Sequence, residues 1–376
     1  MSARKVMLIA GEASGDLLAS ELVTALKKRD PEIECFGAGG SKMLAAGVKL
    51  AFDMTQHAVI GLWEAIRKYF EFRELLHELL LLALERKPDV IVCVDFGGFN
   101  SRFAAALRDH HQHHLAHLEW RPKLVQFVSP QVWASRPGRA DTLARNFDQL
   151  LCILPFEKDW WNRRLPDFPV DFVGHPIVGR HRVTRRATKA PVVALMPGSR
   201  SGELRKHLPI IAETARRVAA AASVSFRMLL PNDDALKLAQ PFIDAIPRCS
   251  ASVGEADAVL SEATAALSKT GTITLECALF GVPTVTFYQT SALTYAIGKR
   301  VVTVPYLSMP NLLANEAVFP EFVQNDASPE NLAAAVLEFL NNKSKRSACQ
   351  KKLEEITATL GQSGAPDRAA KLILDL

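Results

Sequence analysis

Several patterns that mark common protein classes are missing from this 376-residue sequence. The six cysteines form no C-x-x-C pair, and most lie in apolar runs where a thiol is a small buried side chain, which fits a reducing cytosol. The apolar run behind the basic N-terminus, residues 6–10, is shorter than the roughly 7–15 residues of a signal-peptide core. We therefore expect no export signal.

Motifs for dinucleotide binding and for a metal-bridged diphosphate are also missing. The glycine clusters at residues 11–15 and 37–40 lack the G-x-G-x-x-G spacing, which argues against a dinucleotide oxidoreductase. No Asp-x-Asp triplet occurs, so we expect neither a metal nor another cofactor. The net charge of +5 suits anionic substrates or an anionic membrane surface. Because no basic recognition helix is evident, we expect no nucleic-acid partner.

The sequence does contain a series of short buried strands, each followed by a turn and a helix. This alternation predicts an α/β fold, and the chain is too long for one ordinary core, so we expect two Rossmann-like, doubly wound domains facing across a cleft. We assign residues 1–178 to the first domain and 190–345 to the second, joined by a basic link over 179–189. Residues 346–376 are expected to form C-terminal helices that pack back on the first domain.

Residues 267–276, with the sequence LSKTGTITLE, have the pattern of an anion-binding turn. A buried strand pattern ends at a glycine turn, and a helix pattern that runs to Gly281 begins directly after it. The first N–H groups of such a helix have no partner within it, so together with the turn hydroxyls and the helix dipole they would face one anion. The residues concerned are Thr270, Gly271, Thr272 and Ile273. Glu276, one turn later, is placed to accept from ribose hydroxyls; an ordinary helix cap is the alternative.

A cationic side chain is expected in the same domain. A strand over residues 192–195 is followed by Pro197-Gly198-Ser199-Arg200, and an arginine at that point can bridge a diphosphate with two hydrogen bonds. A surface ion pair between Arg200 and Glu203 is the alternative. Pro209 suits the first turn of the helix that runs on to residue 222.

In the first domain, Asp95 follows a strongly apolar strand over residues 89–94. Working groups in open parallel sheets lie just past the carboxyl ends of the strands, so this carboxylate is in a catalytic position. The ordinary alternative is that Asp95 caps a helix beginning at Ser101.

Residues 59–84 predict one or two amphipathic helices. Charged residues recur up to Glu78, and the uncharged run over 79–84 is far below the ~20 residues of a transmembrane helix. One interpretation is one or two core helices that pack on the sheet. The other is a membrane-associating segment that dips into an anionic membrane surface, with Leu62, Trp63 and Phe70 as its lipid-facing side chains.

Five histidines lie within residues 109–117. His110, His113 or His114, and His117 share a helical face and could bind a metal, but no cysteine or acidic partner completes a ligand set. A solvated helix end is the simpler interpretation.

Eight sequence blocks follow one another along the chain: GEASGD (11–16), DF with FN (95–96 and 99–100), SPQVW (129–133), LPFE (154–157), FVGHP (172–176), PGSR (197–200), TGTITLE (270–276) and PNLL (310–313). With these blocks the chain resembles the lipid-A-disaccharide synthase family, whose members are glycosyltransferases of the GT-B fold. The resemblance runs from near the first residue to residue 324, and the family commonly has Ser-Gly-Thr where this chain has Thr270-Gly271-Thr272.

The resemblance implies a reaction that joins UDP-2,3-diacylglucosamine to 2,3-diacylglucosamine 1-phosphate. The products would be the β-1,6-linked lipid A disaccharide 1-phosphate and UDP. Because the donor is an α-glycoside and the product is β, the resemblance implies inversion by a single displacement. It also implies a cytoplasmic location, with peripheral attachment to the inner face of the inner membrane of a Gram-negative bacterium. An oligomer is compatible with the sequence.

Inversion needs a base on the acceptor side, and the first domain must supply it because the second holds the leaving group. We expect Asp95 to be this base, with Glu12 as the next candidate, while Asp16 caps the first helix. The donor would be bound by Ser199, Arg200, Thr270, Gly271, Thr272, Glu276 and Asn311. On the acceptor side we expect Ser14 and Asp16.

Two other functions are compatible with these residues. A non-hydrolysing UDP-N-acetylglucosamine 2-epimerase shares the two-domain fold and a UDP site but needs no lipid-facing helix. A membrane sensor would bind a UDP-sugar without turnover. Release of UDP only when both lipid substrates are present distinguishes the three.

Overall fold

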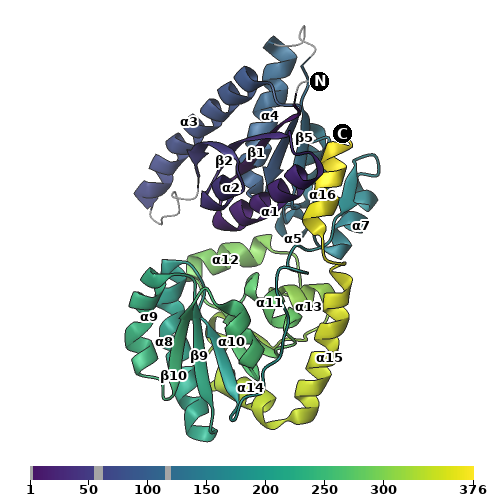
Figure 1. Cartoon of the computed structure of the whole chain (residues 1–376). Helices are drawn as coiled ribbons and strands as arrows, with labels where there is room; N and C mark the ends of the chain where they lie inside the picture. The colour runs from purple at the N-terminus through teal and green to yellow at the C-terminus, as the bar shows by residue number, and fades with distance from the viewer. Residues whose placement is uncertain (1–2, 55–61, 115–119) are drawn as a thin grey trace. The chain divides into compact units, whose positions relative to one another are not determined.

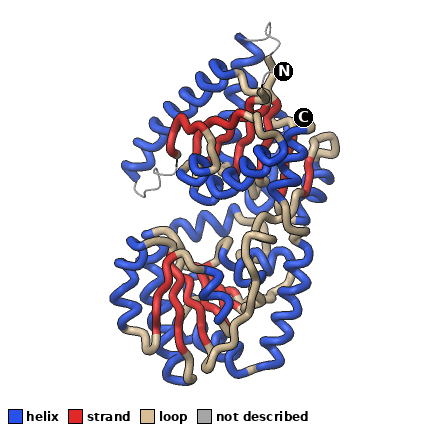
Figure 2. The backbone as a smooth tube through the Cα atoms, in the orientation of Figure 1, coloured by secondary structure: helices blue, strands red, loops and turns tan. Residues whose placement is uncertain are grey.

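A computed structural model describes residues 3–54, 62–114 and 120–376 of the chain, and only the backbone of residues 62–70, 114, 293 and 297. The chain divides into two compact units, one comprising Met1–Gly179 with Leu360–Leu376 and the other Arg180–Thr359. Each unit is a parallel sheet with helices packed against it (Figure 1, Figure 2). The predicted α/β class, with two Rossmann-like sheets, is confirmed. All six cysteines are free thiols, and five are buried, as their apolar runs predict.

The first unit is built on a seven-stranded parallel sheet with the order β3-β2-β1-β4-β5-β6-β7. The order reverses between β1 and β4, and ligands of such sheets bind outside the carboxyl ends of strands at this kind of switch point. Both strands are continuous apolar runs because both faces of the sheet are covered. The strands are β1 (Lys5–Ala10), β2 (Glu34–Gly39), β3 (Lys49–Asp53), β4 (Val90–Val94), β5 (Lys123–Phe127), β6 (Gln149–Cys152) and β7 (Val170–Phe172).

Helices cover both faces of this sheet. One face packs on α1 (Ala13–Arg29), α2 (Ser41–Ala45) and the C-terminal α16 (Ala365–Leu374), which lies beside α1 (Figure 1). The other packs on α3 (Leu62–Arg86), α4 (Gly97–His114), α6 (Ala140–Asn146) and α7 (Pro155–Arg164). The short α5 (Val132–Ser135) follows β5.

Two helices of the first unit begin earlier than predicted. α1 starts at Ala13 rather than at residue 17, because the N–H of Asp16 already donates to Glu12 O (2.8 Å) and the small residues between them enter the helix. α4 starts at Gly97 rather than at Ser101. Both helices therefore begin within three residues of a strand end.

The predicted membrane-associating segment is a single helix, α3, within the described residues. Its C-terminal part belongs to the core, since Leu79 and Ala83 are fully buried and the Phe72 ring lies 5.8 Å from the ring of Phe99. The core interpretation therefore holds for these positions, and a membrane contact by the rest of the segment stays a prediction. The side chains of Leu62, Trp63 and Phe70 lie outside what the structure describes. None of the helices in the described ranges has the length and apolar composition needed to cross a bilayer.

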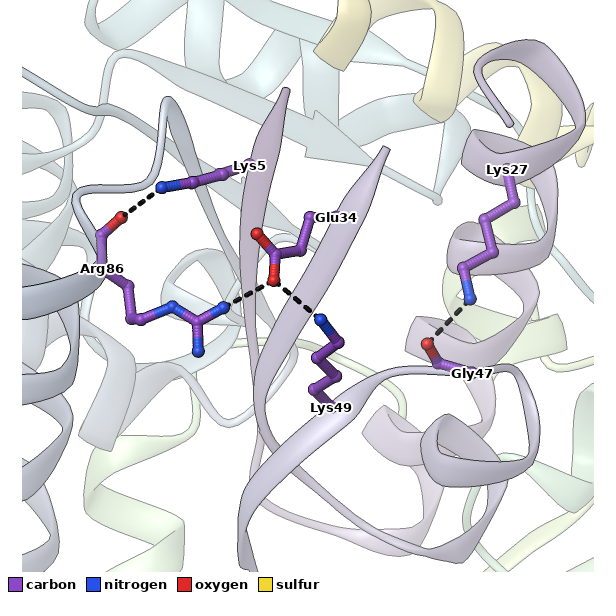
Figure 3. A network of polar contacts seen from close by, with 6 residues as sticks. All are labelled: Lys5, Lys27, Glu34, Gly47, Lys49 and Arg86. Atoms are coloured by element: carbon purple, nitrogen blue, oxygen red, sulfur yellow. Dashed lines mark hydrogen bonds and ion pairs between the residues drawn. The ribbon is translucent and has the colours of Figure 1, made fainter. Parts of the chain in front are cut away.

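A charge network lies at the amino end of this sheet (Figure 3). Glu34, the first residue of β2, accepts from Arg86 (2.5 Å) at the end of α3 and from Lys49 (3.0 Å) at the start of β3. The hydrogen bond from Lys49, assisted by the charge of Arg86, lowers the pKa of the Glu34 carboxyl. These contacts join three elements at the edge opposite the predicted site residues.

The second unit has a six-stranded parallel sheet with the order β10-β9-β8-β11-β12-β13. Its order reverses between β8 and β11, which carry the two predicted donor-binding loops. The strands are β8 (Val192–Met196), β9 (Ser225–Leu230), β10 (Cys249–Val253), β11 (Ala265–Lys269), β12 (Thr284–Tyr288) and β13 (Glu321–Val323). The helices are α8 (Ser201–Ala221), α9 (Asp233–Asp244), α10 (Ala256–Glu262), α11 (Ile273–Leu279), α12 (Ala292–Val301), α13 (Met309–Ala314), α14 (Pro329–Asn341) and α15 (Lys343–Thr359).

Pro209 does not start its helix. α8 begins eight residues earlier, at Ser201, and carries the proline in its interior. Proline has no N–H, so the carbonyl of Arg205 lacks its usual helical donor. Because α8 begins at Ser201, its first turn directly follows Arg200.

The segment that follows Gly179 belongs to the second unit. The Arg185 guanidinium donates to Leu260 O (2.8 Å) and Ala263 O (2.7 Å) at the end of α10. α15 also belongs to the second unit, whereas α16 belongs to the first.

Candidate active site

The two loops predicted at the donor lie side by side in the second unit. β8 and β11 pair in parallel, with Met196 opposite Ser268, so residues 197–200 and 270–272 leave the sheet at the same edge. The loops are in contact: a Cβ built at Gly198 would lie 3.8 Å from Lys269 Cδ. Ser199 and Arg200 are exposed beside the glycine turn.

The turn over residues 270–272 leaves backbone donors available. Thr270 is buried and its N–H donates to Phe287 O (3.0 Å), while Thr274 donates both its N–H (3.0 Å) and its hydroxyl (2.6 Å) to Gly271 O. In the part of the chain that the structure describes, the N–H groups of Gly271 and Thr272 meet no acceptor. α11 then ends at Leu279, one residue before the predicted end and two before Gly281, whose φ is +59°.

Two cations share one carboxylate at this edge. Arg200 Nη1 lies 4.0 Å from Glu203 Oε1, too far for a strong ion pair, whereas Lys269 Nζ lies 3.2 Å from the same oxygen. The alternative for Arg200, a surface ion pair with Glu203, is therefore present only as a contact at 4.0 Å, the longest distance at which two charged groups count as an ion pair. Sequence reasoning assigned no role to Lys269, although a lysine between a strand and a glycine turn is a usable signal.

Glu276 lies on α11, one turn after Thr272. Burial raises the pKa of its carboxyl; the charges of His181 and Arg180 oppose this shift, and that of Asp257 adds to it. His181 Nδ1 in turn lies 2.5 Å from Asp257 Oδ1 on α10. Glu276 therefore lies in a partly buried group of ionisable side chains.

Asn311, the remaining predicted donor residue, is fully buried. Its amide donates to Phe319 O and to Glu321 Oε1, both at 2.8 Å, and its carbonyl accepts from the N–H of Phe319 (2.8 Å). These bonds hold the segment after α13 against β13. A donor contact by Asn311 stays a prediction, and the side chain would have to exchange these bonds to make it.

In the first unit, Asp95 lies just past the end of β4, with its carboxylate near the loop after β1. Asp95 Oδ2 accepts from Ser14 Oγ (3.2 Å). Asp95 has a positive φ of 52°, and its carbonyl accepts from Asn100 Nδ2 (2.7 Å) and Gln126 Nε2 (3.0 Å). Its side chain is thus bonded to the first turn of α1, whereas the alternative placed it at the start of a helix from Ser101.

Asp16 has a structural role. It is buried, and its carboxylate accepts from the N–H groups of Gly40 (2.8 Å), Lys42 (3.0 Å) and Met43 (3.0 Å). It therefore caps α2, and the prediction that it caps the first helix is wrong, because the side chain reaches across to the neighbouring βα turn. Glu12, in the loop after β1, and Ser14, in the first turn of α1, are both exposed.

The model of the lipid-A-disaccharide synthetase family matches residues 6–373 of the chain. The chain belongs to this family. The lipid-A-disaccharide synthase of Myxococcus xanthus (strain DK1622) is 35% identical over 384 residues, which cover 99% of this chain and 97% of that protein. The resemblance seen in eight short blocks therefore extends over the whole chain.

Solved structures support the GT-B fold of this family member. CalG4, the calicheamicin glycosyltransferase, has a TM-score of 0.62 at 14% identity. The match covers 100% of this chain and 98% of the CalG4 chain. A UDP-N-acetylglucosamine 2-epimerase from Listeria monocytogenes, described as putative in that structure, has a TM-score of 0.61 at 14% identity, with 99% and 95% covered. At this identity the likeness concerns the fold alone, so it does not favour the epimerase alternative.

Two buried residues of this synthetase-family chain escaped sequence reasoning. Gln126, on β5, donates to the carbonyl of Asp95 and also to Val128 O (3.1 Å). His207, on α8, places Nδ1 2.8 Å from Pro197 O and Nε2 3.2 Å from Gln289 O, and so joins the loops after β8 and β12. A single polar residue in an apolar pattern gives no sequence signal that separates such roles.

The histidine-rich segment shows no metal site in the described residues. No group of three or more His, Cys, Asp or Glu side chains there is close enough to share an ion. His113 Nε2 lies 3.4 Å from Asp109 Oδ1, and His111 Nε2 lies 2.8 Å from Trp120 O. His117 lies outside the described residues.

Proposed function

We propose that the chain is an inverting glycosyltransferase that joins UDP-2,3-diacylglucosamine to 2,3-diacylglucosamine 1-phosphate. The products are the β-1,6-linked disaccharide 1-phosphate and UDP. The observation that carries the proposal is the family match over residues 6–373. The two α/β units, each with loops at a sheet switch point, support it.

The second unit holds the donor. Arg200 and the N–H groups of Gly271 and Thr272 bind the diphosphate, and Glu276 accepts from the ribose hydroxyls. As the bond from the sugar C1 to the diphosphate oxygen breaks, negative charge grows on the leaving UDP. Donors fixed at that position stabilise the transition state more than the bound substrate.

The first unit supplies the base. Asp95 takes the proton of the acceptor 6-hydroxyl while that oxygen bonds to C1 on the face opposite UDP. The Ser14 hydroxyl donates to Oδ2 of the Asp95 carboxylate (3.2 Å), whereas Oδ1 accepts from no donor among the described residues. Oδ1 is therefore the oxygen that receives the proton.

Both substrates carry acyl chains, so the protein attaches to an anionic membrane surface from the cytoplasmic side. Residues 62–70 of α3, whose sequence combines the aromatic residues Trp63, Tyr69 and Phe70 with the basic residues Arg67 and Lys68, provide the contact.

A reconstitution with purified protein tests the proposed function. We expect UDP release and a β-1,6-linked disaccharide only when donor and acceptor lipids are both present. UDP release from the donor alone, or formation of a 2-epimer, would contradict the transferase. UDP binding without any turnover would favour the sensor.

A further inference from the structure

The ammonium group of Lys269 lies beside the donor-binding turn. Its side chain is 20% exposed, and Nζ lies 5.7 Å from the centre of the Tyr288 ring, which orients it over the end of β12. A Cβ built at Gly271 would lie 3.6 Å from Nζ, and no other described atom beyond the chain neighbours of Gly271 would come within 4 Å. The ammonium therefore faces an open space next to the N–H groups of the turn.

Glu203 is the partner of Lys269 in this state. Its side chain is 15% exposed, and Oε1 lies 3.2 Å from Lys269 Nζ and 4.0 Å from Arg200 Nη1. Its other oxygen, Oε2, is buried, meets no donor in the described residues, and lies 3.0 Å from the position of a Cβ on Gly198. One carboxylate thus lies within 4.0 Å of two cations, one at the end of β11 and one in the loop after β8, which leaves an excess of positive charge at the edge where the diphosphate is proposed to bind.

We propose that Lys269 is a second diphosphate-binding cation of the donor site and that Glu203 is the counter-ion that holds it there before the donor binds. The inference rests on the proposed function, because that function places the diphosphate at residues 270–272. An ammonium group has three N–H donors, and the bond to Glu203 uses one. The others are available to phosphate oxygens, and their attraction increases as charge develops on the leaving group.

A purely structural salt bridge between β11 and α8 is the competing explanation. Such a bridge would affect folding but would not discriminate between ligands with and without phosphates. UDP and uridine are therefore the two probes, because they share the base and ribose and differ in the diphosphate.

The experiment compares the dissociation constants of UDP and uridine for the wild type, Lys269→Met and Arg200→Ala. Methionine keeps an unbranched apolar side chain but removes the charge. Lys237→Met is the matched control, because Lys237 is an exposed lysine paired with Asp234 (3.3 Å) on α9. We expect Lys269→Met to weaken UDP binding by about 10- to 100-fold, the range for loss of a charge-assisted hydrogen bond, with uridine and the control unchanged.

The double variant Lys269→Met/Glu203→Gln tests the counter-ion. In Lys269→Met, the carboxylate of Glu203 faces the diphosphate with one cation fewer. Replacing it by the neutral amide should therefore recover several-fold of the lost UDP affinity. No recovery would overturn the role of Glu203.

The remaining outcomes separate the two proposals. Weakened UDP binding in Arg200→Ala with unchanged binding in Lys269→Met would overturn the role of Lys269 and leave the donor site standing. Unchanged UDP binding in both would overturn the donor site itself. Equal weakening of UDP and uridine in Lys269→Met would assign Lys269 a structural role. The ratio of the dissociation constants of UDP and uridine does not depend on the folded fraction. It therefore distinguishes a diphosphate-binding role of Lys269 from a structural role even if the variant is less stable.

Discussion

Ser14 Oγ lies 3.2 Å from Asp95 Oδ2, and this bond joins the first turn of α1 to the loop after β4. The backbone of Asp95 is held independently, because Asn100 and Gln126 both donate to its carbonyl. A left-handed backbone conformation at an aspartate is uncommon and persists where surrounding contacts fix it. Asp95 is thus held from three elements at the switch point of the sheet: Ser14 bonds its carboxylate, and Asn100 and Gln126 bond its backbone carbonyl.

Asp95→Asn should lower kcat by about 10²–10⁴, the range for loss of a general base. Asparagine keeps the shape and the contact with Ser14 but cannot take a proton. UDP affinity should stay nearly unchanged, because the proposed donor residues belong to the second unit. Steady-state kinetics and UDP titration measure the two effects. Glu12→Gln is the control, and a larger loss in that variant than in Asp95→Asn would transfer the role of base to Glu12.

Arg200→Ala should lower turnover by roughly 10²-fold or more with saturating donor, because the contact strengthens as the leaving diphosphate gains charge. Arg205, an exposed arginine in the first turns of α8, the helix that begins directly after Arg200, is the matched control. Its replacement by alanine removes the same charge five residues further along the chain and should have little effect. Equal turnover in the two variants would place Arg200 outside the site.

The sheets could be predicted from the sequence because their signals are local. β4 is an uninterrupted apolar run, as is β1 after Lys5, and α11 ends at Leu279, one residue before the predicted end and two before Gly281. The strand ends also placed Asp95, Arg200 and the glycine turn at the carboxyl ends of their sheets, and their roles in the site stay predictions. Parallel strands need no further information to bring their carboxyl ends to one edge.

The errors concern residues whose partners are distant in the sequence. The Asp16 carboxylate reaches α2, 24 to 27 positions away, and the ion pair of Glu203 depends on Lys269, 66 positions away. Local patterns do not encode which neighbour a polar group will meet. Pro209 misled in another way, because its preference for a first turn is weaker than the packing that extends α8 on both sides of it.

Glu276→Gln should reduce the preference for UDP over 2′-deoxy-UDP. An ionised carboxylate accepts two strong hydrogen bonds from ribose hydroxyls, whereas an amide carbonyl accepts weaker ones. Burial raises the pKa of the Glu276 carboxyl, so the wild-type preference should also fall as the pH is lowered and the group takes up a proton. Competition binding of the two nucleotides over a pH series measures both effects. A preference that is identical in wild type and variant would remove Glu276 from the ribose site.

Replacing Leu62, Trp63 and Phe70 together by serine should release the protein from anionic vesicles and change its Tm by only a few degrees. Vesicle co-sedimentation and thermal unfolding measure the two quantities. Salt should weaken the wild-type attachment only partly, because the charge contribution is screened and the apolar contribution is not. Leu79→Ser is the contrast, because Leu79 is fully buried on the same helix and its loss should lower Tm strongly. Unfolding of the triple variant would show that these side chains belong to the core.

Glu157 should make the stability of the first unit depend on pH. It lies on α7, fully enclosed, and accepts from Trp133 Nε1 (2.9 Å) and from the N–H of Leu154 (3.0 Å). Burial raises the pKa of its carboxyl from 4.5 to about 7, although these hydrogen bonds oppose the shift. Below the pKa of the unfolded chain, 4.5, the Glu157 carboxyl is protonated in both the folded and the unfolded state. As the pH rises above it, the unfolded chain releases its proton first, so stability is lost until the folded pKa is passed.

The expected loss between pH 4.5 and 7.5 is about 3 kcal/mol of unfolding free energy. Urea unfolding over this pH series measures it, and all five tryptophans lie before residue 162, so their fluorescence reports the first unit alone. Glu157→Gln cannot ionise and should lack this slope, whereas Glu354→Gln, at an exposed glutamate, changes nothing in the first unit and should follow the wild type. Parallel curves for wild type and Glu157→Gln would mean that the carboxyl titrates alike in the folded and unfolded chain, and its burial would then have no energetic consequence in this range.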